Sequence, residues 1–498
     1  MDEQIAEEHF TYAIIGGGIA GVTCAEHLEI LDGEHRTALI SGSDLIKAVT
    51  NVLHLTKSVD VFDVEDKHHS YLQQLCPSVT VKPFTVRTIQ PKKKRILLSS
   101  GACITYDKLC VCTGASPKQL LPEHKHVLYI RDTESVQKFQ QRIRNADRMV
   151  VVGNGGIATE MIYEISGVEI IWAVKDAWFT AAYIDPGAAE FFRPCLTKDK
   201  NPTEVPLVKR KKYTIDNLET TESGSREVAG GALGPDWHEG LDVAGALQRR
   251  TVQLVTKVEV VGLHEPQDLH QDPQLLAKLT LGLKKSSDGK EQPWPVYVEL
   301  SNGLVYGCDF VVSAVGVTPN TSLLSAGDGF TLGADGGVCV GDRMDTAVPD
   351  VYAAGDVCTA AWPWAQHWHQ MRLWTQARQM GSYAAKCMWA SVTQQQIYQD
   401  FCFELFTHAT RFFGHKVVML GLYNGQKLDS KYDILLRMTP GLEYVKVVLK
   451  EGRMQGALLI GDTDLEETFE NLILNQMDLS AYGEDLLDPD VDIEDYFD

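Results

Sequence analysis

The sequence predicts an α/β protein with two doubly wound dinucleotide-binding domains, a small C-terminal α+β domain and an acidic tail. Three patterns support this: a strand, glycine turn and helix near the N-terminus, a second such unit in the middle of the chain, and strand-like runs beyond residue 400. In a doubly wound domain, helices cover a parallel sheet and the turn after its first strand meets a dinucleotide pyrophosphate. The 498 residues suffice for about two to four domains with sizeable cores.

The first unit starts at an apolar run, 12–15, followed by the glycine turn 16–21 (GGGIAG) and a predicted helix over 22–31. In this pattern the first glycine makes a tight turn, the second lets the backbone approach a pyrophosphate, and the third packs the helix against the strand. The N-terminus of the helix then faces the phosphates. The pattern therefore predicts a dinucleotide site at Gly16, Gly18, Ala20 and Gly21.

The next predicted strand, 37–40, ends at Ser41. This is about 20 residues beyond the turn, where an acidic residue that binds the adenosine ribose is usual. Ser41 departs from that rule, although a hydroxyl can also hydrogen-bond a ribose. Asp44 is the alternative ligand, so the ribose contact stays open between these two residues.

The middle of the chain repeats the unit, because an apolar run at 149–152 leads into the turn 153–158 (GNGGIA) and a predicted helix over 159–165. Ala158 stands at the third glycine position, which is a permitted variant. A strand over 169–174 is followed by Lys175 and Asp176. Lys175 favours a nucleotide with a 2′-phosphate, whereas Asp176 favours one with a free 2′-hydroxyl. The signal is therefore mixed, and the prediction leans only weakly towards NADPH. The predicted ligands are Gly153, Gly155, Ile157 and Lys175.

Two polar stretches interrupt the second unit, from about residue 197 to 245 and from about 264 to 293. Their basic, serine and glycine runs predict long inserted loops. Strand-like runs at 416–420, 434–438, 444–449 and 457–460 predict a small C-terminal β-containing domain. A predicted helix over 465–474 follows, and residues 483–498 form an acidic tail with Tyr496 and Phe497 near its tip.

A strand that ends in a Thr-Gly turn (113–114), a later strand and turn through Gly316, and an Ala-Gly-Asp at 354–356 complete an ordered set with the two glycine turns. Over roughly residues 10–390 this set resembles the FAD-dependent pyridine nucleotide-disulphide oxidoreductases. Segments 374–381, 466–471 and 493–498 resemble one animal branch of that family. The resemblance implies a first FAD-binding half over 1–118, an NAD(P)-binding domain over 119–310, a second FAD-binding half over 311–395, a C-terminal domain over 396–480 and a tail over 481–498.

The resemblance also implies roles for single residues. Asp356 stands where the family places an acid on the FAD ribityl chain or pyrophosphate, and Thr113, Gly114, Gly316 and Gly355 belong to the cofactor turns. Lys47 and Glu160 are implied to meet near flavin N5, as in the rubredoxin- and nitrite-reductase-like members. Such a pair would order the site and stabilise charge there, whereas the alternative for each is a surface salt bridge.

The cysteines decide which reactions remain. Disulphide reductases of this fold need two thiols beside the flavin, spaced C-x4-C after the second strand or C-x2-C in the NAD(P) domain, and neither motif is present. The eleven cysteines have no framework spacing, which favours reduced thiols. Cys110 and Cys112 share a strand face and are predicted to be buried and structural. Cys358 follows Asp356 closely and is the thiol predicted nearest the flavin.

Four tryptophans and two histidines crowd the segment after the Ala-Gly-Asp: Trp362, Trp364, His367, Trp368, His369 and Trp374. Core packing is the commoner role of such a cluster, and stacking on the flavin or lining a substrate channel is the alternative. His367 and His369 lack a third ligand nearby and make a poor zinc site, so no metal is predicted.

Composition limits partners and location. A formal charge of −21 argues against direct nucleic-acid binding as the main role, and no apolar run approaches the roughly 18 residues of a membrane span. The first ten residues carry four acids and no Lys or Arg, which fits neither a secretory signal nor a transit peptide. We expect a cytoplasmic protein, with nuclear entry as an option because of the basic runs 92–95 and 209–212.

These observations predict an FAD-dependent NAD(P)H oxidoreductase that passes hydride from the nicotinamide to flavin N5 and then to an external acceptor. The acidic tail and the insertions favour docking on a protein partner, whose redox state would be the target. Two alternatives stay open: a slow-turnover flavoprotein that protects or regulates its partner, and a cofactor-free scaffold.

Overall fold

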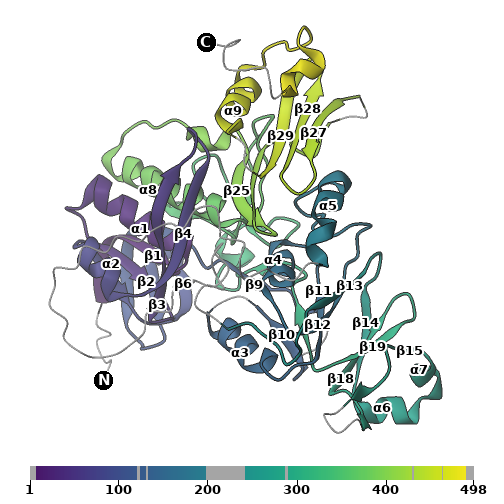
Figure 1. Cartoon of the computed structure of the whole chain (residues 1–498). Helices are drawn as coiled ribbons and strands as arrows, with labels where there is room; N and C mark the ends of the chain where they lie inside the picture. The colour runs from purple at the N-terminus through teal and green to yellow at the C-terminus, as the bar shows by residue number, and fades with distance from the viewer. Residues whose placement is uncertain are drawn as a thin grey trace, which may run out of the picture.

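The computed structural model describes residues 7–120, 124–130, 133–197, 242–285, 290–428, 431–461 and 464–488. They form three domains around a common centre (Figure 1), with the first on the left, the second at the lower right and the C-terminal domain above both. None of the described helices combines the length and apolar character that a membrane crossing requires.

The first domain is built on a sheet in the order β5-β2-β1-β8-β7-β6, with β23 beside β8. The strands are β1 (Glu7–Ile15), β2 (Thr37–Ile40), β5 (Val79–Lys82), β6 (Val86–Gln90), β7 (Arg95–Leu98), β8 (Cys103–Val111) and β23 (Val351–Ala353). Five of these strands run parallel, namely β5, β2, β1, β8 and β23. Helices α1 (Ile19–Asp32) and α8 (Trp374–Thr393) pack together at Gly381, where a Cβ would overlap the Ala20 carbonyl.

A two-stranded antiparallel ribbon leaves this domain after β2, which the sequence analysis did not predict. It consists of β3 (Leu45–His54) and β4 (Asp60–His68). At its base the Lys47 amide donates to the Gly17 carbonyl at 2.9 Å. At its tip, Thr56 and Ser58 donate to the buried carboxylate of Glu470 in the C-terminal domain. The ribbon therefore connects the first glycine turn with the C-terminal domain.

The second domain has a parallel sheet in the order β10-β20-β11-β12-β13. Its strands are β10 (Val127–Tyr129), β11 (Arg148–Val152), β12 (Glu169–Ala173), β13 (Thr251–Val255) and β20 (Phe310–Ser313), and its helices are α3 (Thr133–Ile143), α4 (Gly156–Glu164) and α5 (Pro186–Phe192). Because β20 lies between β10 and β11, the chain leaves this domain after residue 313, slightly later than the predicted boundary at 310.

The two predicted insertions differ in outcome. Residues 198–241 of the first lie outside the described residues. The prediction that the second insertion is a long loop is wrong, because residues 264–293 contain regular elements. These are helices α6 (Pro266–Gln271) and α7 (Pro273–Ala277) and short strands β15 (Leu279–Thr280), β16 (Lys284–Lys285) and β17 (Glu291–Gln292). Strand β15 joins a small sheet with β14 (Val260–His264), β18 (Val296–Leu300) and β19 (Val305–Cys308), whereas β16 and β17 pair with each other.

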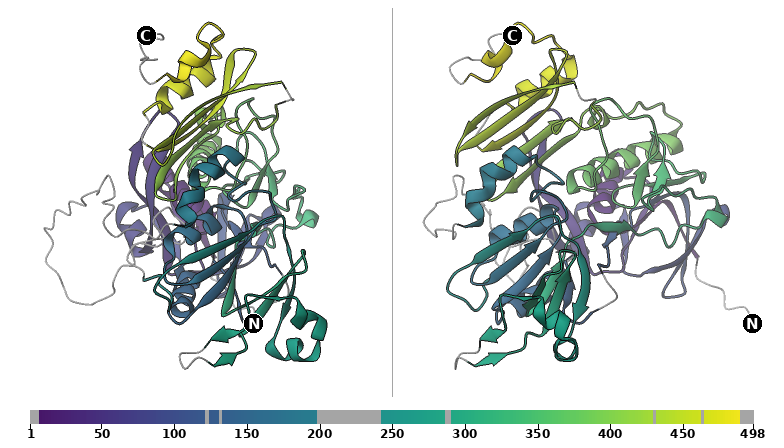
Figure 2. Two further views of the ribbon diagram at one scale, coloured as in Figure 1. Left: turned by 45° about the vertical axis from the view of Figure 1, so that its right-hand side comes forward. Right: turned by 90° about the vertical axis from the view of Figure 1, so that its right-hand side faces the viewer.

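The C-terminal domain is an antiparallel sheet in the order β25-β26-β29-β28-β27. Its elements are β25 (Thr407–Phe412), β26 (His415–Gly421), β27 (Asp433–Thr439), β28 (Glu443–Lys450), β29 (Arg453–Gly461) and α9 (Glu466–Asn475). The four predicted strands and the helix are confirmed, while β25 was missed. Helix α9 covers one face of the sheet, and the other face packs on the second domain (Figure 2).

The predicted acidic tail begins inside this domain. A 3-10 turn, Gly483–Leu487, buries Leu486 and Leu487 in the α9 core. Residues 489–498 lie outside the described part of the chain. An ion pair fixes the domain on its neighbour, since the buried Lys446 of β28 contacts Asp185, the N-cap of α5.

Candidate functional site

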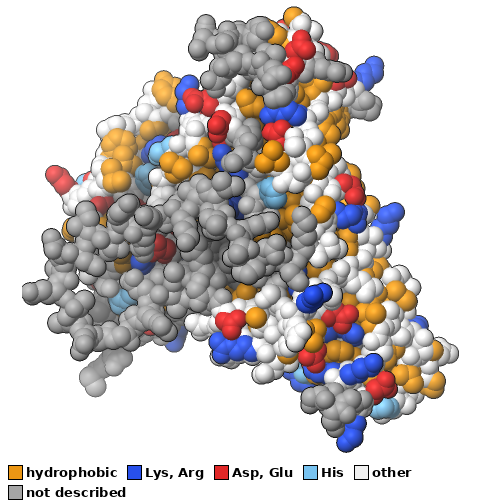
Figure 3. Space-filling view, viewed as in Figure 1, with side chains coloured by type: hydrophobic (Ala, Val, Ile, Leu, Met, Phe, Trp, Pro, Cys, Tyr) orange, Lys and Arg blue, Asp and Glu red, His pale blue; other side chains and the backbone are white. Residues whose placement is uncertain are grey.

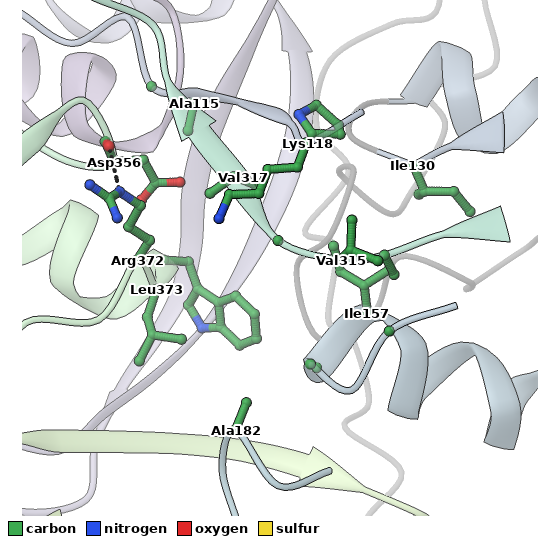
Figure 4. Close-up of a pocket in the computed structure, with 18 of the residues that line it drawn as sticks. Ala115, Lys118, Ile130, Ile157, Ala182, Val315, Val317, Asp356, Arg372 and Leu373 are labelled. Carbon is green, nitrogen blue, oxygen red and sulfur yellow. Dashed lines mark hydrogen bonds between the residues drawn. The ribbon is translucent and has the colours of Figure 1, made fainter. Parts of the chain in front are cut away.

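A single large cavity lies where the three domains meet. Its volume is about 1470 Å³, which exceeds the roughly 300–1,000 Å³ of an ordinary ligand pocket. Both glycine turns line it, and Figure 4 shows Asp356 and Arg372 of the first domain on one side, and Ile157 of α4 with Val315, which follows β20, on the other. A cavity of this size and lining has room for two dinucleotides brought end to end.

The first turn has the shape that the glycine pattern predicts. Gly16 has φ +122°, and a Cβ there would overlap the Cys112 carbonyl of the neighbouring strand. A Cβ on Gly21 would overlap the Gly16 carbonyl, so this glycine serves helix packing. In contrast, no protein atom lies within 4 Å of a Cβ placed on Gly18. The turn is thus closed against the protein on one side and open to a ligand on the other.

The second turn reproduces this arrangement. Gly153 has φ +134° and lies against the Ala314 carbonyl, whereas the space beside Gly155 is open to 4 Å. Helix α4 begins at Gly156, so its free backbone amides face the cavity, where they favour an anion. Two buried hydroxyls that line the cavity, those of Ser313 and Thr410, have no hydrogen-bond partner within the described residues. Unpaired buried donors are uncommon, and they fit a site built for a polar ligand.

Asp356 supplies a partly buried carboxyl to the first-domain part of the cavity. Burial raises the pKa of this carboxyl above its usual range, against the pull of the Arg372 guanidinium. Arg372 holds the segment by donating from Nε to the Asp356 carbonyl at 2.8 Å and from Nη2 to Asp335 at 2.5 Å. A carboxyl held in this way suits a polyhydroxyl chain such as a ribityl group.

Most of the predicted site residues line this one cavity. They are Gly16, Gly18, Ala20, Ser41, Lys47, Thr113, Gly114, Gly153, Gly155, Ile157, Glu160, Lys175, Gly316 and Asp356. Gly21 and Gly355 are not in the lining. Ser41 is buried in the wall while the alternative, Asp44, is exposed outside it, so the geometry favours Ser41.

Lys47 makes a different contact from the one predicted. It lies on β3 directly opposite Asp66 on β4, and its ammonium forms an ion pair with that buried carboxylate. Glu160, on α4, lines the same cavity. Asp66 was not among the predicted site residues, because the pairing of β3 with β4 that brings it to the cavity was not predicted.

At the end of β12, Lys175 and Asp176 both line the cavity. The Asp176 carboxylate already accepts a hydrogen bond from Asn154 Nδ2 at 2.7 Å, and Asn154 Oδ1 accepts from the Thr180 amide at 2.5 Å. Lys118, which was not predicted, adds a further cation to the lining. Figure 4 shows its side chain near Val317.

The cysteines are mostly core residues. Cys110 and Cys112 are buried with their sulfurs 3.5 Å apart, which confirms the predicted burial. Cys112 reaches the cavity wall, while Cys358 is fully buried and is not part of the lining. Burial raises the pKa of Cys358 well above its usual range. Among the described residues, no group of three His, Cys, Asp or Glu side chains could hold a metal ion.

The C-terminal domain contributes a third wall that the sequence did not reveal. His408, Thr410 and Phe412 alternate along β25 and line the cavity, as does Trp374 at the start of α8. Of the clustered tryptophans, Trp362 and Trp368 pack in the core, as expected for the commoner role. Residues 407–412 (THATRF) do not alternate apolar and polar side chains, so this strand had no clear signal in the sequence.

Comparisons with known proteins place this chain near one family of oxidoreductases. The family model described as pyridine nucleotide-disulphide oxidoreductase matches residues 10–200 and 245–381. A mouse protein named pyridine nucleotide-disulfide oxidoreductase domain-containing protein 1 is 48% identical over 495 residues, which cover 98% of each chain.

Two solved structures show the same fold. A covalent putidaredoxin reductase–putidaredoxin complex aligns with a TM-score of 0.61 at 16% identity, over 95% of this chain and 94% of that one. A water-forming NADH oxidase from Lactobacillus brevis, bound to NADH, aligns with a TM-score of 0.61 at 16% identity, over 94% and 91%.

Proposed function

Because this chain belongs to the pyridine nucleotide-disulphide oxidoreductase family, we propose that it binds FAD in the first domain and NAD(P)H in the second, as an NAD(P)H-dependent flavoprotein oxidoreductase. The observation that carries the proposal is the single cavity lined by both open glycine turns. Bound FAD would supply the centre that accepts a hydride at N5. The protein contributes binding, orientation and electrostatics.

The residues of the cavity divide these tasks. The amides at the start of α1 and α4 would bind the two pyrophosphates, and the Asp356 carboxyl the ribityl hydroxyls. Lys47 brings a positive charge to the cavity wall beside the first turn, and Asp66 holds it there by an ion pair. Trp374 and Tyr183 offer aromatic surface that excludes water from the same region.

The electron acceptor in this proposal is external. In the part of the chain that the structure describes, the thiol that reaches the cavity is Cys112, and its neighbour Cys110 is buried behind it on β8. This arrangement differs from an exposed dithiol that could pass electrons to a disulfide. We favour a protein partner, including its thiols, as the target, which would make this an NAD(P)H-dependent oxidoreductase acting on sulfur groups.

The surface charge is compatible with a protein partner. Figure 3 shows Lys and Arg side chains interspersed with Asp and Glu on the visible face. The total charge is −21.

The alternative proposal is a slow-turnover flavoprotein that protects or regulates its partner. Cytoplasmic location, with nuclear entry, completes the proposal, and fractionation of cells that express a tagged chain would check it.

The absorption spectrum of the purified protein tests the function. We expect a flavin band that NAD(P)H bleaches in the absence of oxygen. Rapid recovery of the band on adding an acceptor would support an enzyme, whereas a bleached state that persists would support the regulatory alternative. A protein that stays colourless after incubation with FAD would contradict both and leave the scaffold.

The choice of nicotinamide nucleotide gives a second prediction. Because Asn154 already engages Asp176, Lys175 is the freer of the two side chains, and we propose that it binds a 2′-phosphate. Lys175→Ala should then weaken NADPH binding about tenfold to a hundredfold, the cost of one charged hydrogen bond, and leave NADH binding unchanged. Titration of the anaerobic protein with each nucleotide measures this. Lys118→Ala is the matched comparison, expected to affect both nucleotides equally, and equal losses in Lys175→Ala would contradict the proposal.

A further inference from the structure

His408 stands between the dinucleotide cavity and a second, much smaller cavity. The small cavity has a volume of about 10 Å³, roughly the room that one water molecule needs. Asp60 of β4, Thr375 and Arg378 of α8, and Thr407 of β25 belong to its walls. His408 belongs to the walls of both cavities, so it lies between the large one and the small one.

Hydrogen bonds lie on both sides of the small cavity, between His408 and the surface. Its Nδ1 lies 3.1 Å from the Thr375 hydroxyl, and both residues are buried. Across the small cavity, the Asp60 carboxylate accepts from Arg378 Nη1 at 2.5 Å and contacts His54 Nδ1 at 2.6 Å. The His54 side chain is 71% exposed. A series of proton-carrying groups therefore runs from the cavity to solvent.

The environment of His408 suits a group that passes protons without keeping them. Desolvation lowers the pKa of this histidine to about 3, so the imidazole is neutral near pH 7. A neutral imidazole has one nitrogen that donates and one that accepts. The rings of Trp374 and Tyr183, with centroids at 5.1 and 6.4 Å, hold it in place.

The proposed function requires one proton to cross between cavity and solvent in each turnover. NAD(P)H delivers two electrons and one proton as a hydride. An acceptor that binds two electrons and two protons needs one more proton from solvent. An acceptor that takes electrons alone leaves one proton to be released. The need for a proton path is therefore independent of the acceptor.

We propose that His408 and Thr375 relay this proton between the dinucleotide cavity and the surface, through the small cavity and Asp60. The inference rests on the proposed function. In each passage His408 accepts a proton at one ring nitrogen and releases one from the other, and the Thr375 hydroxyl does the same with its oxygen. Neither group gains a net charge, and the proton comes from or goes to solvent beside His54.

Thr375→Val tests the relay, because it keeps the shape of the side chain and removes the hydroxyl. Anaerobic bleaching by NAD(P)H should stay within about twofold of the unaltered protein, since hydride transfer itself needs no solvent proton. Turnover with a soluble quinone should fall about tenfold to a hundredfold, as for loss of proton-transfer catalysis. The solvent deuterium isotope effect on turnover should rise. Unchanged turnover with an unchanged isotope effect would overturn the relay.

A second readout does not depend on turnover. Nitrogen NMR of the His408 side chain reports which ring nitrogen carries the proton, and we expect Thr375→Val to change that tautomer balance. Asp60→Asn interrupts the path at its outer end and should also raise the isotope effect. Thr23→Val is the matched control, since it removes a buried hydroxyl that has no partner in the described part of the first domain. If the unaltered protein fails to bleach, the proposed function fails instead of the relay.

Discussion

Gly18→Glu is expected to yield a colourless protein, and Gly155→Glu a yellow protein that NAD(P)H no longer bleaches. The two glycines occupy equivalent places in the two turns. Gly18 has φ −78° and Gly155 φ −96°, values that any residue adopts. A Cβ at either position meets no protein atom within 4 Å. The new side chain therefore fills ligand space without straining the fold.

The size of the effect follows from charge. A carboxylate placed about 4 Å from a pyrophosphate, at an effective dielectric constant near 20, costs about 4 kcal/mol, which corresponds to about a thousandfold in affinity. Flavin content after incubation with FAD, and titration of the anaerobic flavin band with NAD(P)H, measure the two effects separately. Each variant should lose one ligand and keep the other.

Alanine at the same positions separates the effect of added volume from the effect of charge. Gly18→Ala and Gly155→Ala add one methyl group to open space and carry no charge, so their losses should be much smaller than those of the glutamates. After bound nucleotides are removed from every sample, thermal unfolding of all four variants should match the unaltered protein closely. Normal FAD content in Gly18→Glu would contradict the assignment of the first turn to FAD, and normal bleaching in Gly155→Glu that of the second turn to NAD(P)H.

The glycine turns could be predicted from sequence because their chemistry is local. Gly16 is needed where φ is positive and where the Cys112 carbonyl comes close, and both demands belong to one strand, turn and helix unit. The wall formed by β25 could not be predicted in the same way. His408 reaches the cavity only because the C-terminal sheet packs on the second domain, a contact between segments more than 200 residues apart.

The second insertion shows a different kind of error. Its polar composition indicated a loop, yet helix signals were present. Glu265 and Asp272 each precede a proline and cap the N-termini of α6 and α7, Glu265 together with Asp268 in a capping box. Acidic caps with proline at the first helical position are typical helix starts. Weighing these signals above composition would have predicted both helices.

Lys47→Met is expected to slow anaerobic bleaching by NAD(P)H about a hundredfold, the typical effect of removing one preorganised charge from a reaction centre. Lys47 lines the cavity beside the first turn, where its backbone amide donates to the Gly17 carbonyl at 2.9 Å. A cation there stabilises the negative charge that hydride transfer brings to the flavin. The midpoint potential of the bound flavin should therefore become more negative in this variant.

Asp66→Asn should shift the midpoint potential in the opposite direction. Without the carboxylate, the Lys47 charge is no longer offset, and negative charge on the flavin becomes more favourable. Lys67→Met is the matched control, because Lys67 pairs with Glu65 at 2.7 Å on the same ribbon and is not part of the cavity lining. It should leave the potential unchanged. Potentials measured against a reference dye during slow reduction report these shifts.

Glu160→Gln tests which carboxylate pairs with Lys47 when the dinucleotides are bound. The sequence resemblance pairs Lys47 with Glu160, whereas the geometry pairs it with Asp66 across the β3 and β4 ribbon. If the geometry holds, Lys47→Met with Asp66→Asn should depart strongly from additivity, since residues in contact are coupled. Lys47→Met with Glu160→Gln should come closer to additivity. The reverse ranking would mean that Lys47 exchanges Asp66 for Glu160 when the dinucleotides bind.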